Sequence, residues 1–363
     1  MLKGGNNCKF LVIGLLVALT YIGTVVHIHQ GLQVFLHTVL LVYLGAVFSA
    51  KLFDVKKERE VEIMQQKDAW MFPVFGSGVL FGLFLIFRYI NKDYVNMLFH
   101  YYFSVIGGYS VSSLLYERLI GLEPFENLAK VQVVTIPPVK FVTDKPTQIT
   151  LLDVFTLIIG GIVGLLYFFY KNWTLNNILG ITFCVFGIEN IMLGQFKVGF
   201  ILLCLLFFYD IFWVFGTPVM VEVAKNLDGP IKLMFPKHIP VESAKDFNMI
   251  GLGDIVIPGI YVALMLRFDL MQYLKKHSNA VEVPATLENL KYFIATMIGY
   301  ASGILATLFV MYYFQAAQPA LLYLVPGCLI SSLLVAFVNK ELHQLWDFSE
   351  EAFLNELKAK KEN

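Results

Sequence analysis

Two aspartates lie in apolar stretches of the sequence, where an ionisable side chain is unexpected. Asp210 falls in the stretch 205–216 and Asp254 in the stretch 250–262. Placing a charge at the centre of a bilayer costs at least ~2.5–3.5 kcal/mol, so acids in membrane spans are functional candidates. These two carboxyl groups are therefore the first candidates for a reactive site.

The spacing of the two aspartates predicts that they lie at similar depths in the membrane. Asp210 lies ten residues before the end of a predicted span, 198–220, and Asp254 lies seven residues after the start of the next, 247–268. At 1.5 Å per residue these depths are ~15 and ~10 Å. Because consecutive helices usually pack side by side, we expect the two carboxyl groups to face each other.

Two carboxyl groups in one site have a specific chemistry. They cannot both ionise at low cost, so the pair is expected to share one proton. The ionised member can take a proton from water while the protonated member polarises a carbonyl group. This chemistry hydrolyses a peptide bond without a metal or a cofactor, and the sequence contains no zinc-ligand spacing.

Glycine and proline surround the second aspartate, at Gly251, Gly253, Pro258 and Gly259. One interpretation is functional: small residues and a weakened helix let an extended substrate strand approach the aspartate. The other is structural, because small residues also allow membrane helices to pack closely. The sequence leaves both interpretations open.

The composition indicates that these residues are positioned by membrane helices. The chain has 363 residues, of which 58% are hydrophobic and 15% charged, whereas soluble domains average about 45–50% and 25%. The net charge is +0, so no nucleic-acid partner is expected, and the four isolated cysteines predict neither disulfides nor a zinc site. Only helices or closed barrels satisfy the backbone in lipid, and so many spans predict helices.

We predict an all-α polytopic membrane protein with nine transmembrane helices. The predicted spans are 31–50, 71–90, 94–116, 150–170, 176–193, 198–220, 247–268, 292–314 and 319–339. An N-terminal hydrophobic leader at 10–26 follows Lys3 and Lys9, and is either a signal peptide or a signal anchor that adds a span. Other ionisable residues near spans, Arg88, His100 and Asp153, are interpreted as structural.

The chain divides into four predicted regions. These are the leader at 1–30, an N-terminal helical membrane region with cytosolic loops at 31–193, a catalytic membrane region at 194–340, and a cytosolic tail at 341–363. With residue 31 outside the cytosol, the cytosolic side carries 17 Lys and Arg residues and the other side carries 6. The excess of basic residues predicts that the tail is cytosolic.

Three short motifs occur in order on three different predicted spans. They are Tyr209-Asp210, Gly251-Leu252-Gly253-Asp254 and Pro319-Ala320-Leu321. They resemble the YD, GxGD and PAL motifs of the presenilin and signal peptide peptidase superfamily of intramembrane aspartyl proteases. The longer strings at 209–216 and 318–326 resemble the signal peptide peptidase branch more closely than presenilin.

The resemblance implies a function and a place in the cell. Members cleave helical transmembrane segments, such as signal peptide remnants and type II membrane proteins, in the endoplasmic reticulum membrane. It makes Asp210 and Asp254 the catalytic dyad on the sixth and seventh spans, and Pro319-Ala320-Leu321 a support that positions substrate. Near the C-terminus, Lys360 and Lys361 resemble a dilysine signal for retrieval to the endoplasmic reticulum.

Two other classes of protein remain open. A transporter or channel could use Asp210, Asp254 and Glu189 to relay protons, although Glu189 is also interpreted as a structural hydrogen-bond acceptor. A non-catalytic scaffold for membrane-protein quality control would use none of these acids chemically. The expected partners are helical peptide substrates within the lipid bilayer, with a homo-oligomer or quality-control partners as further candidates.

Overall fold

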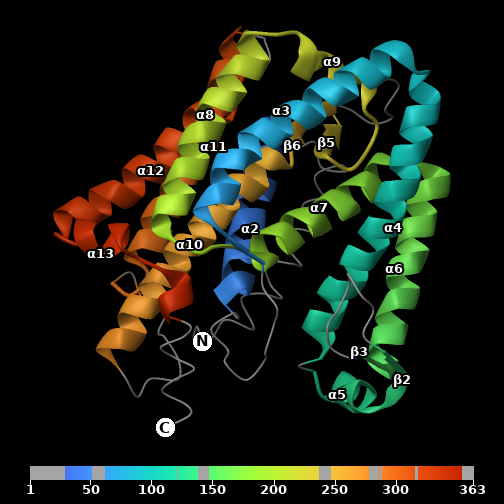
Figure 1. The fold of residues 1–363 in the computed structure, drawn as a ribbon, viewed down its shortest axis with the longest axis horizontal. Helices are drawn as coiled ribbons and strands as arrows, with labels where there is room; N and C mark the ends of the chain where they lie inside the picture. The colour runs from blue at the N-terminus through green and yellow to red at the C-terminus, as the bar shows by residue number, and fades with distance from the viewer. Residues whose placement is uncertain are drawn as a thin grey trace.

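The computed structural model describes residues 29–50, 62–120, 122–137, 147–236, 247–277, 286, 288–314 and 318–353. This part of the chain is mostly helical (Figure 1). Its helices are α2 (Gln30–Ser49), α3 (Gln66–Tyr89), α4 (Lys92–Leu119), α5 (Glu123–Lys130), α6 (Leu151–Tyr170), α7 (Trp173–Asn190), α8 (Phe196–Phe215), α9 (Val219–Asn226), α10 (Gly253–Lys276), α11 (Lys291–Phe314), α12 (Leu321–Val338) and α13 (Leu342–Trp346). The predicted leader at 10–26 and the two lysines Lys360 and Lys361 lie outside the described residues.

Six of the described helices are long and apolar enough to cross a bilayer, namely α2, α3, α6, α8, α11 and α12. Three others, α4, α7 and α10, have at least 18 residues but are less apolar. Each of these three has many residues buried against other helices, so its surface need not be apolar on all sides. The chain is a multi-pass membrane protein, and the structure leaves the predicted number of nine spans unconfirmed.

Helix α10 is the centre of the main bundle. All residues of α10 from Pro258 to Met271 are buried. It contacts α2, α7, α8, α11 and α12, and Figure 1 shows it passing behind α3 and α8. The pair α4 and α6 forms the right-hand side of Figure 1 and contacts the bundle mainly through α7. The residues that follow Gly253 are therefore held by five surrounding helices.

Close contact between glycines brings neighbouring helices together. A side chain added at Gly299 of α11 would overlap the backbone oxygen of Gly327 in α12, and the reverse also holds. In the same way, a side chain at Gly160 of α6 would overlap the backbone of Gly108 in α4. Small residues at such crossings are typical of membrane helices, where packing replaces hydrophobic burial as the driving force.

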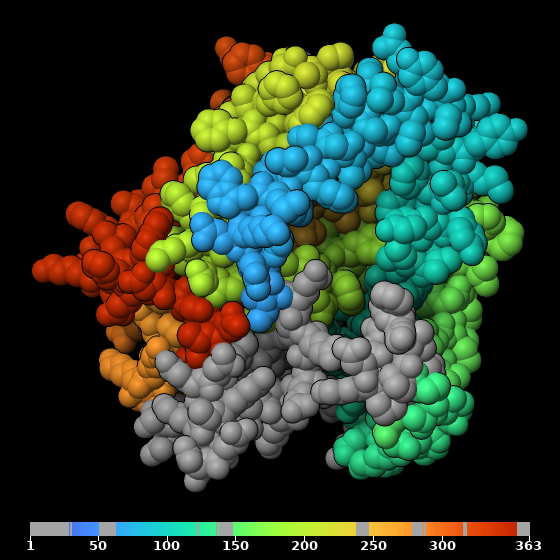
Figure 2. All heavy atoms as spheres, in the orientation of Figure 1, coloured from blue at the N-terminus to red at the C-terminus, as the bar shows by residue number. Residues whose placement is uncertain are grey.

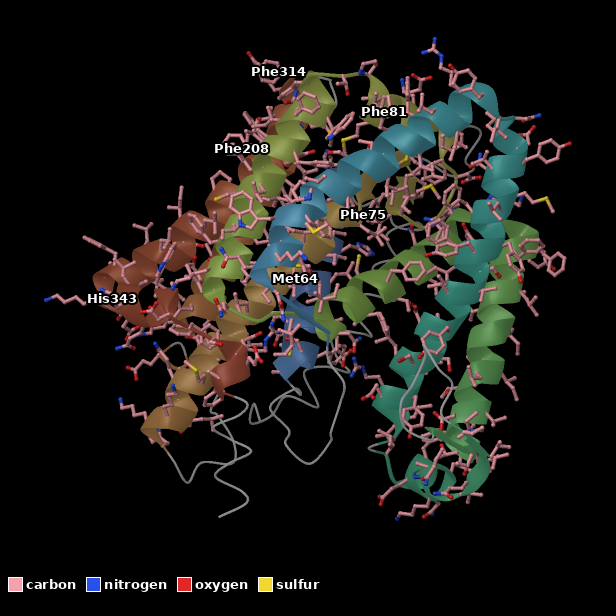
Figure 3. All side chains as sticks on the ribbon, in the orientation of Figure 1. Met64, Phe75, Phe81, Phe208, Phe314 and His343 are labelled. Atoms are coloured by element: carbon pink, nitrogen blue, oxygen red, sulfur yellow. The ribbon has the colours of Figure 1, made fainter. Side chains whose placement is uncertain are left out.

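The outer surface is rich in exposed apolar side chains, and the helices α3 and α8, which carry several of them, face the viewer in Figure 2. Phe75 and Phe81 project outward from α3, Phe208 from α8 and Phe314 from the end of α11 (Figure 3). Each of them is 48% to 74% exposed. Large apolar patches of this kind mark a surface that is covered by another apolar phase, which here is lipid.

Three small sheets correct the expectation that the fold is entirely helical. Strand β1 (Glu62–Met64) pairs in parallel with β4 (Ile191–Leu193), and β2 (Gln132–Ile136) pairs antiparallel with β3 (Thr147–Thr150). The third sheet is the antiparallel pair of β5 (Lys232–Pro236) and β6 (Phe247–Gly251). Strand pairing satisfies the backbone polar groups of segments that link buried helices.

The β5–β6 pair also corrects two predicted helix boundaries. The predicted span 247–268 begins with a strand, and α10 starts only at Gly253. The predicted span 198–220 ends at Phe215, shortly before Pro218, which has no backbone N–H to continue the helix. Both aspartates therefore lie nearer to helix ends than predicted. Strand β6 replaces the start of the predicted span 247–268, and β5 falls in the predicted connection between the two spans.

The segment after α12 folds back onto the bundle. The backbone of Phe348 accepts a hydrogen bond from Phe196 at the start of α8 (3.3 Å), and its ring packs edge-on against Phe268 of α10. Glu350 forms an ion pair with Arg267 of α10, and both side chains are 0% exposed. This segment, residues 347–353, thus connects the start of α8 to the second half of α10.

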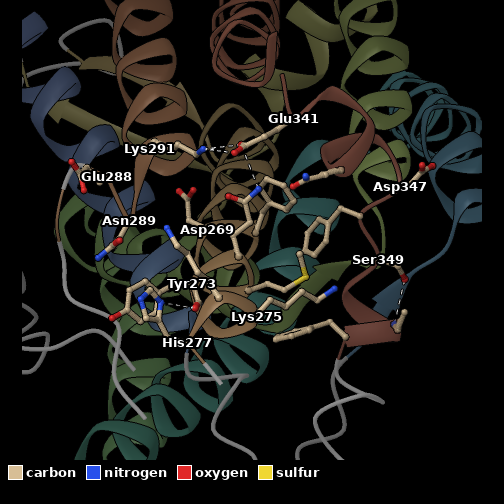
Figure 4. Close-up of a pocket in the computed structure, with 18 residues that line it drawn as sticks. Asp269, Tyr273, Lys275, His277, Glu288, Asn289, Lys291, Glu341, Asp347 and Ser349 are labelled. Atoms are coloured by element: carbon tan, nitrogen blue, oxygen red, sulfur yellow. Dashed lines mark hydrogen bonds and ion pairs between the residues drawn. The ribbon is translucent and has the colours of Figure 1, made fainter. Parts of the chain in front are cut away.

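A cavity of about 810 Å³ lies beside this segment, at the end of α10 and the start of α11 (Figure 4). In its wall, Lys291 pairs with Glu341 at 2.7 Å, and the hydroxyl of Tyr292 donates to the same carboxylate at 2.8 Å. Burial alone would raise the pKa of Glu341, but these partners hold it below its usual value.

We expect the Glu341 contacts to stabilise the protein at neutral pH and not in acid. A carboxyl group with a lowered pKa in the folded state contributes stability above its unfolded pKa and loses it as the pH falls. Glu341→Gln should therefore lower the thermal midpoint near neutral pH, and its difference from wild type should shrink as the pH falls below the ordinary pKa of glutamate, about 4.3. Thermal unfolding in detergent across this range measures the effect, and a constant difference would contradict it.

Candidate active site

Asp210 lies in the last two turns of α8 and is 4% exposed. Its Oδ2 accepts a hydrogen bond from the backbone N–H of Leu321 at 3.0 Å. Leu321 is the first residue of α12, and the N–H groups of a first helical turn have no partner within their own helix. The Asp210 carboxyl therefore occupies the positively polarised end of α12.

Asp254 lies in the first turn of α10, directly after β6 and the turn that follows it. The N–H of Leu252 in that turn donates to the carbonyl of Ile231, next to β5, at 2.9 Å. The Asp254 side chain is half-buried, and its Oδ2 lies 3.4 Å from the position that a Cβ at Gly251 would take. The absence of a side chain at Gly251 thus leaves room for the carboxyl group.

The fold brings the two aspartates together. Their carboxyl groups are close enough to interact electrostatically. Helices α8, α10 and α12 contact one another, so the three motif-bearing elements meet at the end of the bundle that carries β5 and β6. Two carboxyl groups that interact at one site are what a carboxyl dyad requires.

The β5–β6 hairpin is attached to the bundle mainly through β5. Asn177 of α7 donates to the carbonyl of Met234 at 2.7 Å and accepts from its N–H at 2.8 Å, and Asn176 donates to Lys232. These bonds occupy the outer edge of β5. In the described residues β6 pairs only with β5, and Met249 in β6 is 44% exposed.

The other predicted motif residues fall in different surroundings. Pro319 and Ala320 are buried directly before Leu321. Tyr209 packs next to Gly76 of α3 and against the ring of Trp213, and so faces α3. Leu252 is 9% exposed and belongs to the core, whereas Gly253 is exposed.

The structure separates the two interpretations of the glycines. A side chain at Gly259 would collide with Ile188 of α7, so this glycine serves close helix packing. Gly251 ends strand β6 and lies beside the Asp254 carboxyl, and Gly253 has open space where a side chain would stand. These two glycines leave the turn before Asp254 accessible.

Glu189, Asp153 and His100 have structural partners. Glu189 forms an ion pair with Arg118 of α4, and Asp153 forms a capping box with Thr150 at the start of α6. His100 lies 3.4 Å from Asp228, and its hydrogen bond holds the pKa of Asp228 below the usual value. Within the described residues no group of three or more His, Cys, Asp or Glu side chains could hold a metal ion.

One residue beside the dyad was missed by sequence reasoning. Tyr300 of α11 is buried, and its hydroxyl donates to the backbone carbonyl of Asp254 at 3.4 Å. A tyrosine in an apolar span carries no spacing that would identify its partner. The one available signal was Pro258, because a proline leaves a backbone carbonyl one turn earlier without its usual donor.

The chain is similar over most of its length to known intramembrane proteases. The model of the signal peptide peptidase family matches residues 56–352. Signal peptide peptidase from Mus musculus is 36% identical over 334 residues, which cover 87% of this chain and 82% of the mouse protein. The Homo sapiens protein of that name is 35% identical over the same shares. Intramembrane protease 2 from Caenorhabditis elegans is 44% identical over 201 residues, 54% of this chain and 43% of the worm protein.

The fold and these similarities define a multi-pass intramembrane protease. The chain belongs to the signal peptide peptidase family.

Proposed function

We propose that this protein is an aspartic endopeptidase that hydrolyses peptide bonds within transmembrane helices, with Asp210 and Asp254 as its catalytic dyad. The proposal rests on the electrostatic interaction between the two carboxyl groups, one of which accepts a hydrogen bond from the first residue of α12, Leu321. The amide of Leu321 and the positive end of α12 favour negative charge on Asp210. Asp210 is then the base that activates water, and Asp254 carries the proton that polarises the substrate carbonyl.

The position of strand β6 supports a model for how the substrate peptide reaches the two aspartates. A helical peptide must unwind before an acid can reach its amide bonds. The outer edge of β6 has no strand partner among the described residues, and the strand leads within three residues to Asp254. An unwound substrate segment can add to such an edge as a further strand, with its backbone hydrogen bonds providing affinity.

The membrane arrangement follows from the same proposal. The nine long helices of the described chain are the nine spans, with α8 and α10 as the sixth and seventh. The distribution of Lys and Arg supports a cytosolic tail, with the β5–β6 hairpin on the opposite side. We place the protein in the endoplasmic reticulum membrane, acting on signal peptide remnants and type II membrane proteins.

The test uses purified protein in detergent and a synthetic peptide with a signal-peptide-like helix. We expect wild-type protein to release products cut within the apolar segment. A transition-state isostere with a hydroxyethylene core should inhibit this cleavage, whereas Asp254→Ala should release no product. Equal product from the wild type and Asp254→Ala would remove Asp254 from the mechanism, and a transporter or scaffold would show no cleavage at all.

A further inference from the structure

The backbone carbonyl of Asp254 lacks the donor that a regular helix would give it. In an α-helix each carbonyl accepts a hydrogen bond from the N–H four residues later. For Asp254 that residue is Pro258, which lies inside α10 and has no N–H. The proline ring also crowds the carbonyl four residues earlier and turns it outward. The regular helical hydrogen bond from residue 258 to the backbone carbonyl of Asp254 is therefore missing in α10.

A side chain from another helix takes the place of the missing donor. The Tyr300 hydroxyl on α11 donates to the Asp254 carbonyl at 3.4 Å, and Tyr300 is 0% exposed. Thr38 of α2, whose hydroxyl donates to the carbonyl of Phe35 at 3.0 Å, is a hydrogen-bond neighbour of the same Tyr300 hydroxyl. Tyr300 thus links α2, α11 and the start of α10.

We propose that Tyr300 is a positioning residue for Asp254. Its hydroxyl replaces the helix hydrogen bond that Pro258 removes, and so fixes the peptide from which the Asp254 carboxyl projects. This inference rests on the proposed catalytic function of Asp254.

The surroundings of Asp254 make this single contact important. Gly251 and Gly253 precede the aspartate and allow many backbone conformations. On the other side, Pro258 leaves the backbone carbonyl of Asp254 without its helical hydrogen-bond donor. Catalytic groups must be held within about 0.5 Å of the productive geometry, and an anchor outside α10 can supply that restraint.

The test is a double-mutant cycle in purified full-length protein. Tyr300→Phe keeps the ring and removes only the donor, whereas Pro258→Ala restores the helical N–H. We expect Tyr300→Phe to lower kcat about tenfold and leave KM within about twofold, because a less firmly held Asp254 slows the chemical step and leaves substrate binding unchanged. In the Pro258→Ala background, which supplies its own donor, Tyr300→Phe should lower kcat by less than about threefold.

The matched control is Tyr292→Phe. Tyr292 is also buried on α11, but its hydroxyl bonds Glu341 beside the cavity of Figure 4. This variant should keep the wild-type kcat. Affinity for the hydroxyethylene isostere, measured for every variant, should fall with Tyr300→Phe and not with Tyr292→Phe.

The outcomes separate this inference from the proposed function. Full activity of Asp254→Ala would refute the proposed function. An inactive Asp254→Ala together with a wild-type kcat for Tyr300→Phe would refute the role of Tyr300 alone. Equal loss from Tyr300→Phe in both backgrounds would also refute it, because the hydroxyl would then act independently of Pro258. Should Pro258→Ala not fold, the comparison of Tyr300→Phe with Tyr292→Phe decides.

Discussion

Asp210→Asn is expected to abolish peptide hydrolysis while leaving the fold intact. Asparagine has nearly the same shape, and its side-chain oxygen can still accept the hydrogen bond from the Leu321 N–H. It cannot take a proton from water, so the base of the dyad is lost. General base catalysis contributes about 10²–10⁴-fold, and we expect a loss of at least a hundredfold in kcat.

The matched control for Asp210→Asn is Asp153→Asn. Asp153 is also an acid in a membrane helix, but it caps the start of α6 and has no contact with the dyad residues among its hydrogen bonds. It should keep wild-type kcat with a small loss of stability. Initial rates of peptide cleavage and thermal unfolding should be measured for both variants. More than a tenth of wild-type activity in Asp210→Asn would contradict the assignment of the base.

Glu350→Ala is expected to lower the free energy of unfolding by about 3–5 kcal/mol, because it leaves Arg267 as a buried charge without its carboxylate. Both members of the pair are 0% exposed. The Nη1 atom of Arg267 is buried and has no hydrogen-bond partner among the described residues, so Glu350 provides the main compensation. Thermal unfolding in detergent and the yield of folded protein measure this effect.

Two further variants show whether the buried charge is the cause. Glu351→Ala removes the exposed neighbouring carboxyl and should leave stability within about 0.5 kcal/mol of wild type. Arg267→Met combined with Glu350→Leu replaces the pair by apolar side chains, and should recover most of the stability lost in Glu350→Ala. A destabilisation of Glu350→Ala below about 1 kcal/mol would show that water or another group already compensates Arg267.

Most helices and both aspartates could be predicted from the sequence, because long apolar runs and charges within them are local signals. The start of α10 could not. The run at 247–251 is apolar and short, and periodicity alone does not distinguish a short strand from a helical segment. Its pairing with β5 depends on a second strand and on Asn177 of α7, none of which is visible from the run itself.

The contacts that complete the site are between residues distant in sequence. Leu321 lies 111 residues after Asp210, and Tyr300 lies 46 residues after Asp254. The resemblance of Pro319-Ala320-Leu321 to the PAL motif predicted a supporting role. The contact of the Leu321 amide with Asp210 could not be predicted, because it depends on how α12 packs against α8. Glu350 was assigned to a charged tail, since nothing near it in the sequence indicates that it would be buried with Arg267.

The segment at 347–353 has a consequence for biosynthesis. A ribosome delivers every long helix of the described chain before it reaches Phe348, so α8 and α10 are in the membrane before the residues that join them. Until Glu350 arrives, the guanidinium of Arg267 has no carboxylate from this segment and must be hydrated or held by another protein. The release of residues 347–353 from the ribosome is therefore the step at which this buried charge gains its partner.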